Sequence, residues 1–413
     1  MENDKKNILI VGKGAAASSL AQKLVSQGVC KVFVASGNGI ESENYTNVDL
    51  REDDLTGLLK FALENEISLT VPVSELALKS DIVSFFMSNG QSIFGPVKEA
   101  CNIALNKAAG KKFLYKIHAQ TSKFGVFDKQ QMAEDWLRTA NFPVTIKCFE
   151  SNNIGDRLVC TTVSLAGQFL ENLFSRGESG VLLEEYVFGH NFTVYFVTDG
   201  YSSLPFAVVG NYKFLEDGDG GILTNGSGCY VPDYRVSELV VQRVQNVVRN
   251  ALVSLDKKGE PYVGILGVEC VMTGEDKFYI NEFKSFLQDF DAASVLNLLD
   301  ENLIKLFTAC IEGLFSDDYE QIKINDLSSV TAVVSSRSEG KYISGLELVD
   351  DIKNLGFINV KKGLDGKYIT GQNEVFVLTR TASTLTRARN YLYEDLAQIS
   401  FDGMKYRHDI CKG

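Results

Sequence analysis

The first hundred residues alternate short apolar runs with segments of helical periodicity, and this alternation leaves few folds open to the chain. The apolar run at 7–11 leads into the turn Gly12-Lys13-Gly14, a helical pattern over 15–27 and a second apolar run at 31–35. Further units of the same kind follow to about residue 100. Strands that alternate with helices through short connections form a parallel sheet with helices on both faces. We therefore expect an α/β domain at the start of the chain.

The turn after the first run has the pattern Gly12-x-Gly14-x-x-Ala17, which fits a dinucleotide-binding loop. Glycines let an anion approach the backbone at a helix N-terminus, where N–H groups favour negative charge. The second strand ends in Val34-Ala35-Ser36-Gly37, without the carboxylate that would hold a ribose hydroxyl. The loop therefore favours a phosphate or a phosphosugar over a nicotinamide cofactor, and a tight turn without a ligand stays open.

The rest of the chain mixes helices and strands in an α+β manner. Strand patterns occur at 145–148, 181–186, 193–198 and 204–209, and a long helical pattern runs over 236–255. The runs 264–272 and 277–283 flank Thr273-Gly274-Glu275-Asp276, a hairpin signal. Beyond about residue 330, strands at 330–334 and 374–380 and a helix at 384–399 predict a small α+β cap.

Composition excludes several classes of function. The formal net charge of -12 argues against non-specific binding to nucleic acid. The eight cysteines form no CxxC pair and there are three histidines, so neither a zinc site nor a disulfide framework is expected. The apolar run near the N-terminus is too short for a signal peptide or a membrane span. We expect a cytoplasmic protein with small-molecule substrates and no membrane or nucleic-acid partner, as a monomer, with a dimer as the alternative.

Motifs spread over nearly the whole length resemble the phosphoribosylamine–glycine ligase (glycinamide ribonucleotide synthetase) family of ATP-grasp enzymes. The Asp217–Gly221 loop and the C-terminal run at 401–410 are the most family-specific. In chain order the motifs are Val11-Gly12-Lys13-Gly14, Phe94-Gly95-Pro96, Asn106-Lys107, Pro143-Val144-Thr145-Ile146-Lys147, Glu184-Glu185-Tyr186-Val187-Phe188-Gly189, Tyr212-Lys213, Asp217-Gly218-Asp219-Gly220-Gly221, Asn225-Gly226-Ser227-Gly228-Cys229-Tyr230, Asn281-Glu282-Phe283 and Phe401-Asp402-Gly403-Met404-Lys405-Tyr406-Arg407-His408-Asp409-Ile410.

The resemblance implies an α/β and α+β architecture. It consists of a Rossmann-like (pre-ATP-grasp) domain over 1–103, an ATP-grasp domain over 104–328 with its small lobe at about 121–190, and a small α+β C-terminal domain over 329–413. It also implies ATP and Mg²⁺. Glycine would accept the γ-phosphate as an acyl phosphate, and phosphoribosylamine would then displace phosphate to form an amide in purine biosynthesis.

The resemblance also implies site residues. Lys147 has support from the sequence itself, because a charge within the apolar strand 144–149 is costly unless it has a partner. For Glu184 and Glu185, an ordinary strand end stays open. The implied ATP-binding residues are Lys107, Lys147, Glu184, Glu185, Val187 and Lys213, and the implied substrate-side residues are Gly12, Gly14, Glu75, Asp217, Asp219 and Asp289.

For the metal, Glu282 matches a Mg²⁺ carboxylate of the family, and the hairpin would bring Glu269 beside it as our own candidate for a second ligand. The family has an asparagine where this chain has Lys284. An ammonium offers no oxygen to Mg²⁺ and repels the ion, so Lys284 weakens the predicted metal site.

Other family motifs are altered as well. Ala15-Ala16-Ala17-Ser18 stands where the family has Gly-Arg-Glu-His, and His190-Asn191 replaces an acidic pair, one member of which holds the ATP ribose. Three hypotheses stay open: an active ligase of the family, a paralogue that joins a different amine and carboxylate, and a non-catalytic nucleotide-binding relative.

Overall fold

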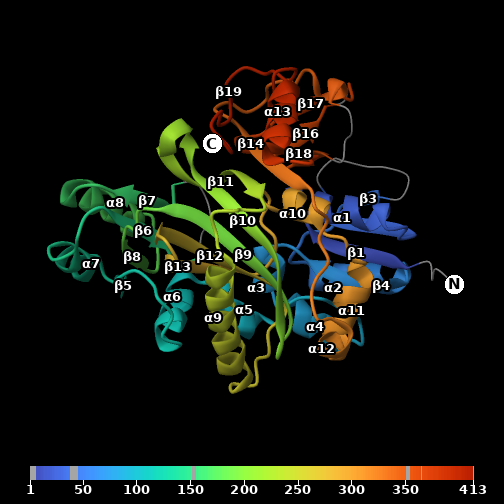
Figure 1. Ribbon diagram of the computed structural model, residues 1–413, viewed down its shortest axis with the longest axis horizontal. Helices are drawn as coiled ribbons and strands as arrows, with labels where there is room; N and C mark the ends of the chain where they lie inside the picture. Colours follow the sequence, from blue (N-terminus) through green and yellow to red (C-terminus); the bar gives the residue numbers. More distant parts are fainter. Residues whose placement is uncertain (1–5, 38–44, 151–154, 350–353, 364, 413) are drawn as a thin grey trace.

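The computed structural model describes residues 6–37, 45–150, 155–349, 354–363 and 365–412. Figure 1 shows a wide central part with the N-terminal elements on one side, a small lobe on the other and the C-terminal elements above. In the part of the chain so described, no helix combines the length and apolarity that a membrane span requires.

The N-terminal part is the expected parallel sheet, with strands in the order β3-β2-β1-β4. Strand β1 is buried because both of its faces are covered, and helix α1 starts directly after the Gly12–Gly14 turn. The elements are β1 (Asn7–Gly12), α1 (Ala15–Ser26), β2 (Lys31–Ser36), β3 (Tyr45–Val48), α2 (Leu55–Glu64), β4 (Ile67–Pro72), α3 (Glu75–Lys79), α4 (Ile82–Ser88) and α5 (Lys98–Leu105).

Two expectations for this part were wrong in detail. The predicted helix over 77–89 is divided into α3 and α4, because Asp81 has a left-handed backbone (φ 63°) and accepts a hydrogen bond from Ser84 Oγ at 2.7 Å. The predicted strand at 92–94 is reduced to an isolated bridge between Thr70 and Ile93.

The small lobe is a separate antiparallel sheet in the order β5-β8-β6-β7, with α7 and α8 packed on it (Figure 1). Its apolar core includes Ile146 and Leu183, which lie on one face of the sheet. The opposite face of the same strands carries charged side chains. The elements here are α6 (Lys107–Lys116), β5 (Phe124–Phe127), α7 (Gln130–Leu137), β6 (Val144–Cys148), β7 (Arg157–Cys160), α8 (Val163–Ser175) and β8 (Val181–Glu185).

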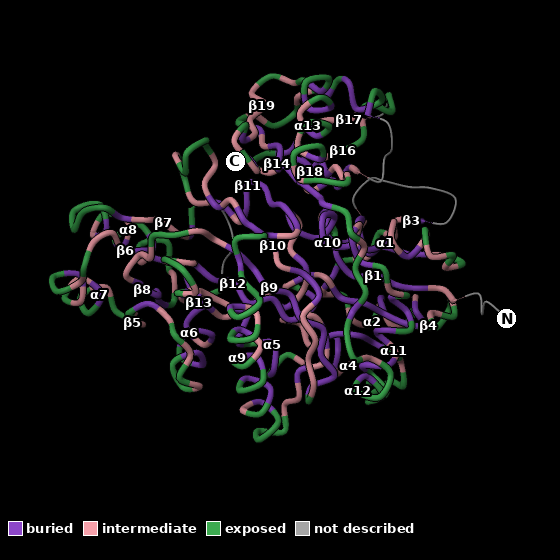
Figure 2. The backbone as a smooth tube through the Cα atoms, viewed as in Figure 1, coloured by how far each residue is buried: buried purple, intermediate pink, exposed green. Residues whose placement is uncertain are grey.

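The central part is built on a nine-stranded sheet whose main path is β13-β12-β9-β10-β11-β14-β18-β15. Figure 2 shows these central strands buried along much of their length, with α9 packed outside them and exposed on its outer side. The elements are β9 (His190–Asp199), β10 (Ser203–Glu216), the 3-10 turn η1 (Asp217–Asp219), β11 (Gly220–Val231), α9 (Glu238–Asp256), β12 (Val263–Gly274), β13 (Lys277–Lys284), α10 (Ala292–Leu298), α11 (Leu303–Glu312) and α12 (Phe315–Asp318).

The C-terminal part continues the same sheet. Strand β14 pairs with β11 on one side and with β18 on the other, and α13 covers β14 and β18. The expected division at residues 103 and 328 stays a prediction. The elements are β14 (Ser328–Ser336), η2 (Leu346–Leu348), β15 (Leu355–Phe357), β16 (Val360–Lys362), β17 (Tyr368–Thr370), β18 (Asn373–Ala382), α13 (Leu385–Leu396) and β19 (Met404–Lys405).

Candidate active site

The hairpin of β12 and β13 brings two of the predicted residues together. In its register Glu269 lies opposite Glu282, as the sequence predicts. Lys284 follows Glu282 by two residues, so the pleat of the strand directs both side chains to the same face. Two carboxylates directly opposite each other repel, and this face therefore needs cations.

Lysines from three further elements converge on these carboxylates. Lys107 begins α6, Lys147 lies on β6 and Lys213 lies on β10. Lys107 Nζ lies 3.2 Å from Glu282 Oε2, and Lys213 Nζ lies 2.6 Å from Glu269 Oε2. Lys147 Nζ is 3.9 Å from Glu282 Oε2. The structure thus joins predicted residues that are separated by up to 175 positions in the chain.

Glu184 extends the cluster into the small lobe. Its Oε2 lies 2.8 Å from Lys147 Nζ, and its Oε1 lies 2.5 Å from Lys111 Nζ. Lys111 was not predicted, although its spacing of four residues from Lys107 places both on one face of α6. We call the resulting set the lysine–glutamate cluster; its members are Lys107, Lys111, Lys147, Lys213, Lys284, Glu184, Glu269 and Glu282.

The electrostatics of the cluster keep its opposed carboxylates Glu269 and Glu282 ionised. Burial alone would raise the carboxyl pKa values, but the lysines hold the pKa of Glu269 at about 2 and that of Glu282 well below its usual range. Burial lowers the pKa of Lys107 to about 8 against the attraction of Glu282. Five ammonium groups against three carboxylates leave a surplus of positive charge, which suits a polyphosphate.

The predicted segment at the end of β8 divides between two surfaces. Glu184 points into the cluster, whereas Glu185 faces outward and pairs with Lys123 at 3.2 Å. This alternation follows from the pleat of the strand. Val187 lines a polar cleft together with both glutamates, Lys147 and Lys213. The predicted roles of these residues in binding adenine or phosphate stay predictions.

Asp291 lies behind the cluster and was not among the predicted site residues. Its carboxylate accepts hydrogen bonds from Tyr195 OH at 2.7 Å and from Asn211 Nδ2 at 2.9 Å. Complete burial raises its pKa to about 6. Its sequence signal was an acidic residue between Phe290 and Ala292, which by itself does not indicate burial.

A second cavity, of about 270 Å³, lies where the N-terminal, central and C-terminal parts meet. Gly14 and Asp289 line it, as do Glu52 and Glu374, which were not predicted. The Asp289 carboxylate accepts a hydrogen bond from the Ala16 N–H at 2.7 Å and so occupies the N-terminus of α1. A Cβ on Gly14 would lie 2.3 Å from Asp289 Oδ1, so the close approach requires glycine.

Acidic side chains predominate over basic ones in the lining of this second cavity. Burial raises the pKa of Asp289, and the neighbouring Glu52 raises it further. Burial and then Asp289 raise the pKa of Glu374, whose Oε1 has no hydrogen-bond partner among the described residues. Of the lining residues that the structure describes, Lys13 is the cation. We call this space the acidic cavity.

The remaining predicted substrate residues do not line the acidic cavity. Gly12 ends β1 and packs against Val73, and Glu75 begins α3, where it pairs with Lys79 at 3.5 Å. Asp217 and Asp219 lie at the tip of the β10–β11 hairpin.

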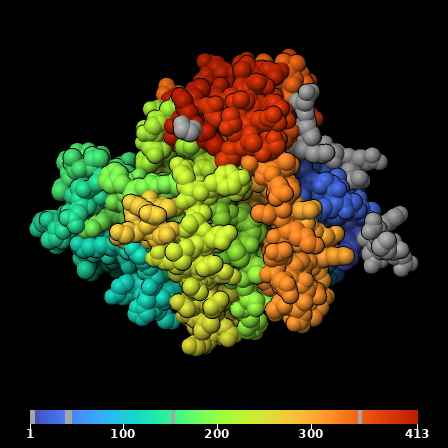
Figure 3. Space-filling model, in the orientation of Figure 1, coloured from blue at the N-terminus to red at the C-terminus, as the bar shows by residue number. Residues whose placement is uncertain are grey.

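The hairpin tip contacts the C-terminal segment of the chain. Asp217 Oδ1 accepts a hydrogen bond from the His408 N–H at 2.7 Å, and Asp219 Oδ1 accepts one from Arg407 Nη1 at 2.8 Å. Figure 3 shows the C-terminal residues in red, directly beside this hairpin. In this arrangement the two aspartates bind the chain itself, which the sequence pattern did not indicate.

The residues around Glu269 and Glu282 do not fit a divalent cation. Lys284 Nζ contacts Glu282 Oε1 and lies 3.5 Å from Glu269 Oε2, so an ammonium already stands between the two carboxylates. Mg²⁺ requires oxygen ligands at about 2.0–2.1 Å in nearly octahedral geometry. Lys284 supplies no oxygen and adds repulsion at that point.

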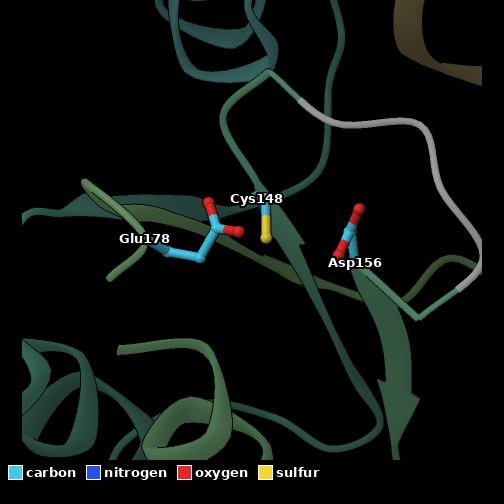
Figure 4. A group of neighbouring side chains, drawn as sticks. All are labelled: Cys148, Asp156 and Glu178. Atoms are coloured by element: carbon cyan, nitrogen blue, oxygen red, sulfur yellow. The ribbon is translucent and has the colours of Figure 1, made fainter. Parts of the chain in front are cut away.

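A different group of ligand-type side chains occurs in the small lobe. Figure 4 shows Cys148 with Asp156 and Glu178 close to its sulfur. Arg176 Nη2 already donates to Asp156 Oδ1 at 2.9 Å and lies 3.8 Å from Glu178 Oε1. Burial and the two carboxylates raise the pKa of the Cys148 thiol to about 12, and a metal would need the thiolate. This group is therefore an ion-paired cluster and not a metal site.

Comparison with known families accounts for the arrangement. The model for the N domain of phosphoribosylglycinamide synthetase matches residues 6–104, and the model for its ATP-grasp (A) domain matches residues 105–292. The chain belongs to the phosphoribosylglycinamide synthetase family. The family resemblance and the ATP-grasp fold that the sequence predicts are thereby confirmed.

Individual relatives extend over the whole chain. A phosphoribosylamine–glycine ligase of Caldanaerobacter subterraneus is 27% identical over 417 residues, covering 98% of this chain and 99% of the relative. One of Lactococcus lactis is 28% identical over 408 residues, covering 98% of each chain. These members of the phosphoribosylglycinamide synthetase family match the C-terminal part as well, which the two family models do not reach.

Solved structures agree on the fold. The phosphoribosylamine–glycine ligase of Thermotoga maritima superposes with a TM-score of 0.82 at 22% identity, covering 98% of this chain and 100% of that one. The biotin carboxylase domain of a Hydrogenobacter thermophilus 2-oxoglutarate carboxylase, determined with MgADP, ADP and bicarbonate, has a TM-score of 0.72 at 14% identity and covers 97% of this chain and 91% of that one.

Proposed function

We propose that this protein is an ATP-dependent ligase that joins the carboxylate of glycine to the amine of 5-phosphoribosylamine, a step of purine biosynthesis. The carrying observation is the convergence of Lys107, Lys147 and Lys213 from three elements on the carboxylates of the lysine–glutamate cluster, in which ammonium groups outnumber carboxylates. Lys147 and Lys213 also line the polar cleft beside it. Family membership supports the same reaction.

The chemistry has two steps. A carboxylate oxygen of glycine attacks the γ-phosphorus, the bond to the bridging oxygen of ADP breaks, and an acyl phosphate forms. The amine nitrogen then attacks the acyl carbon, phosphate leaves, and the nitrogen loses a proton as the amide forms. Negative charge shifts among phosphate oxygens in both steps, and fixed ammonium groups stabilise it without reorganisation.

The lysines are suited to that task by their surroundings. Each is held by a buried carboxylate, so its position is fixed before a nucleotide arrives. Phosphate oxygens would accept hydrogen bonds from the same ammonium groups that bind the glutamates. The surplus positive charge of the cluster would balance the charge of the phosphates. Val187 and the end of β8, beside the cluster, are the proposed adenine contacts.

The test is a reconstituted reaction. Purified protein with ATP, glycine and freshly prepared phosphoribosylamine should release ADP and phosphate only when both substrates are present, and mass spectrometry should detect the amide. The reaction is run with MgCl₂ and with EDTA. Retained ATP binding without turnover of either substrate would contradict this function and favour a non-catalytic nucleotide-binding relative.

A second candidate is a ligase that uses an amine without a phosphate. The acidic cavity favours it, because Asp289, Glu52 and Glu374 would repel a 5′-phosphate and attract an ammonium or polyol amine. The phosphate expected at the N-terminus of α1 would also compete with the Asp289 carboxylate.

A matched pair of amines separates the two candidates. Phosphoribosylamine and ribosylamine differ only in the phosphate, and the proposed ligase should have the higher kcat/KM with the former. A higher kcat/KM with ribosylamine would favour the second candidate. In that case Glu374→Gln should lower the KM for phosphoribosylamine, because one repelling carboxylate is removed.

A further inference from the structure

The position of Lys284 has a consequence for how nucleotide is held. The side chains of Lys284, Glu269 and Glu282 are 10, 8 and 12% exposed, so the three charges interact through little water. Lys284 Nζ contacts one oxygen of each glutamate. It occupies the space between two opposed carboxylates where a divalent cation would otherwise balance their charge.

An ammonium in this position differs from a metal ion in its chemistry. It has three N–H donors and no acceptor, so it can donate to a carboxylate and to a phosphate oxygen at the same time. It is covalently attached and cannot be removed by a chelator. The carboxylates that could have ligated a cation are also engaged by Lys107 and Lys213, which further lowers their capacity to hold one.

We propose that Lys284 replaces a protein-bound divalent cation, and that the cluster binds nucleoside diphosphates and triphosphates without one. This inference rests on the proposed function and specifies how that site recognises the polyphosphate. Free nucleotide carries more negative charge than its Mg²⁺ complex, and the charge surplus of the lysine–glutamate cluster favours the free form.

The first experiment uses the unaltered protein. Calorimetric titration with ADP and with a non-hydrolysable ATP analogue is carried out in EDTA and in MgCl₂ at equal ionic strength. The affinity in EDTA should equal or exceed the affinity in MgCl₂, whereas a nucleotide whose binding depends on a metal would bind far more weakly in EDTA. An affinity that falls tenfold or more in EDTA would overturn the proposal.

The second experiment restores an oxygen ligand. In Lys284→Asn, ADP affinity should fall at least tenfold in EDTA and recover on addition of Mg²⁺. Mn²⁺ titration followed by electron paramagnetic resonance should detect one bound ion per chain in this variant and none in the unaltered protein. A bound Mn²⁺ in the unaltered protein would contradict the proposal.

Lys277→Asn is the matched control, because Lys277 lies on the same strand but at its exposed end. It should behave as the unaltered protein in both experiments. If Lys284→Asn does not fold, as judged by circular dichroism, the comparison of EDTA and MgCl₂ in the unaltered protein still decides the question.

The outcomes also separate this inference from the proposed function. Turnover together with strictly Mg²⁺-dependent nucleotide binding would overturn the inference and leave the function standing. Nucleotide binding in EDTA without turnover of glycine and phosphoribosylamine would support the inference and overturn the function. No nucleotide binding under either condition would overturn both.

Discussion

Lys147 is a charged residue in a strand whose neighbours Ile146 and Cys148 are buried in the core of the small lobe. Its ammonium reaches the opposite face of the sheet and meets Glu184 and Glu282. Burial lowers its pKa, but the two carboxylates outweigh burial and raise the pKa above its usual value. Lys147 therefore stays protonated at any physiological pH.

Replacing Lys147 by methionine should weaken nucleotide binding. Lys147→Met keeps the length of the side chain but removes one ammonium from the cluster, and we expect the Kd for ADP in calorimetry to rise at least tenfold. Lys129→Met is the control, since Lys129 is an exposed residue of the same lobe. An unchanged Kd in Lys147→Met would contradict the assignment of this residue to phosphate binding.

The members of the cluster were only partly predictable from the sequence. Local sequence patterns indicated Lys147, Glu269 and Glu282. A lysine in an apolar strand needs a buried partner, and a hairpin turn brings the two glutamates opposite each other. Lys284 lies in the same hairpin, two residues after Glu282, so its position beside both carboxylates is a local property as well. The burial of Asp291, by contrast, depends on Tyr195 and Asn211 from strands far away in the chain. Lys111 could have been found from its helical spacing to Lys107.

At the scale of elements, the N-terminus of α1 is joined to the segment before α10 through Asp289. Gly14→Ala would push a methyl group into the Asp289 carboxylate and break this link. We expect a loss of about 1–3 kcal/mol in the free energy of unfolding, measured by urea denaturation.

Gly167→Ala provides the comparison for that measurement. Gly167 lies within α8, and a Cβ there would have open space around it. Alanine should stabilise this helix by about 1 kcal/mol. Equal effects of the two substitutions on the free energy of unfolding would mean that the contact of Asp289 with α1 does not stabilise the fold.

The tip of the β10–β11 hairpin is held to the C-terminal segment by Asp409. Arg407 donates to both of its carboxylate oxygens, at 2.8 and 2.7 Å, and the Gly218 N–H donates at 2.8 Å. Although burial opposes it, these hydrogen bonds hold the pKa of Asp409 at about 2, below its ordinary value of 3.8.

This depressed pKa predicts an effect of pH on stability. The ionised carboxylate stabilises the folded state above about pH 4, and this contribution is lost as the pH falls towards 2. Asp409→Asn should therefore be less stable than the unaltered protein at pH 7, and the gap should narrow between pH 4 and pH 2 in urea denaturation. A gap that stays constant over this range would contradict the assigned cause.

The elements themselves were largely predictable, because periodicity and turn residues are local signals. Strands β1, β2 and β4, the long helix α9 and the β12–β13 hairpin follow the predicted ranges within a few residues, whereas β3 was not predicted. Two features were not predictable from the sequence. The helix break at Asp81 arises from a left-handed backbone, and the hairpin tip contacts Arg407 across nearly 190 residues, and neither leaves a periodic pattern.

At the scale of the molecule, the eight cysteines are all free. Six are buried, Cys411 is half-buried and Cys30 is exposed. Burial raises the pKa of Cys101 and Cys148 to about 12, so these thiols are also unreactive.

Thiol labelling should reflect this distribution. With a chromogenic disulfide reagent at neutral pH, one thiol should react rapidly in the native protein and all eight should react in guanidinium chloride. The melting temperature should not change on addition of a reducing agent. Rapid labelling of several thiols in the native protein would show that the core opens more readily than the packing implies.

The main hydrophobic core includes residues of β1, β10 and β18, so it draws on the N-terminal, central and C-terminal parts together. The pairing of β11 with β14 over Gly228–Val231 carries the sheet across that junction. A chain truncated after residue 327 would leave β11 with an open edge and uncover the apolar side chains beneath it. Open edges recruit strands of other molecules. We therefore expect the truncated chain to sediment as large aggregates in analytical ultracentrifugation, even though both matched family domains remain in it.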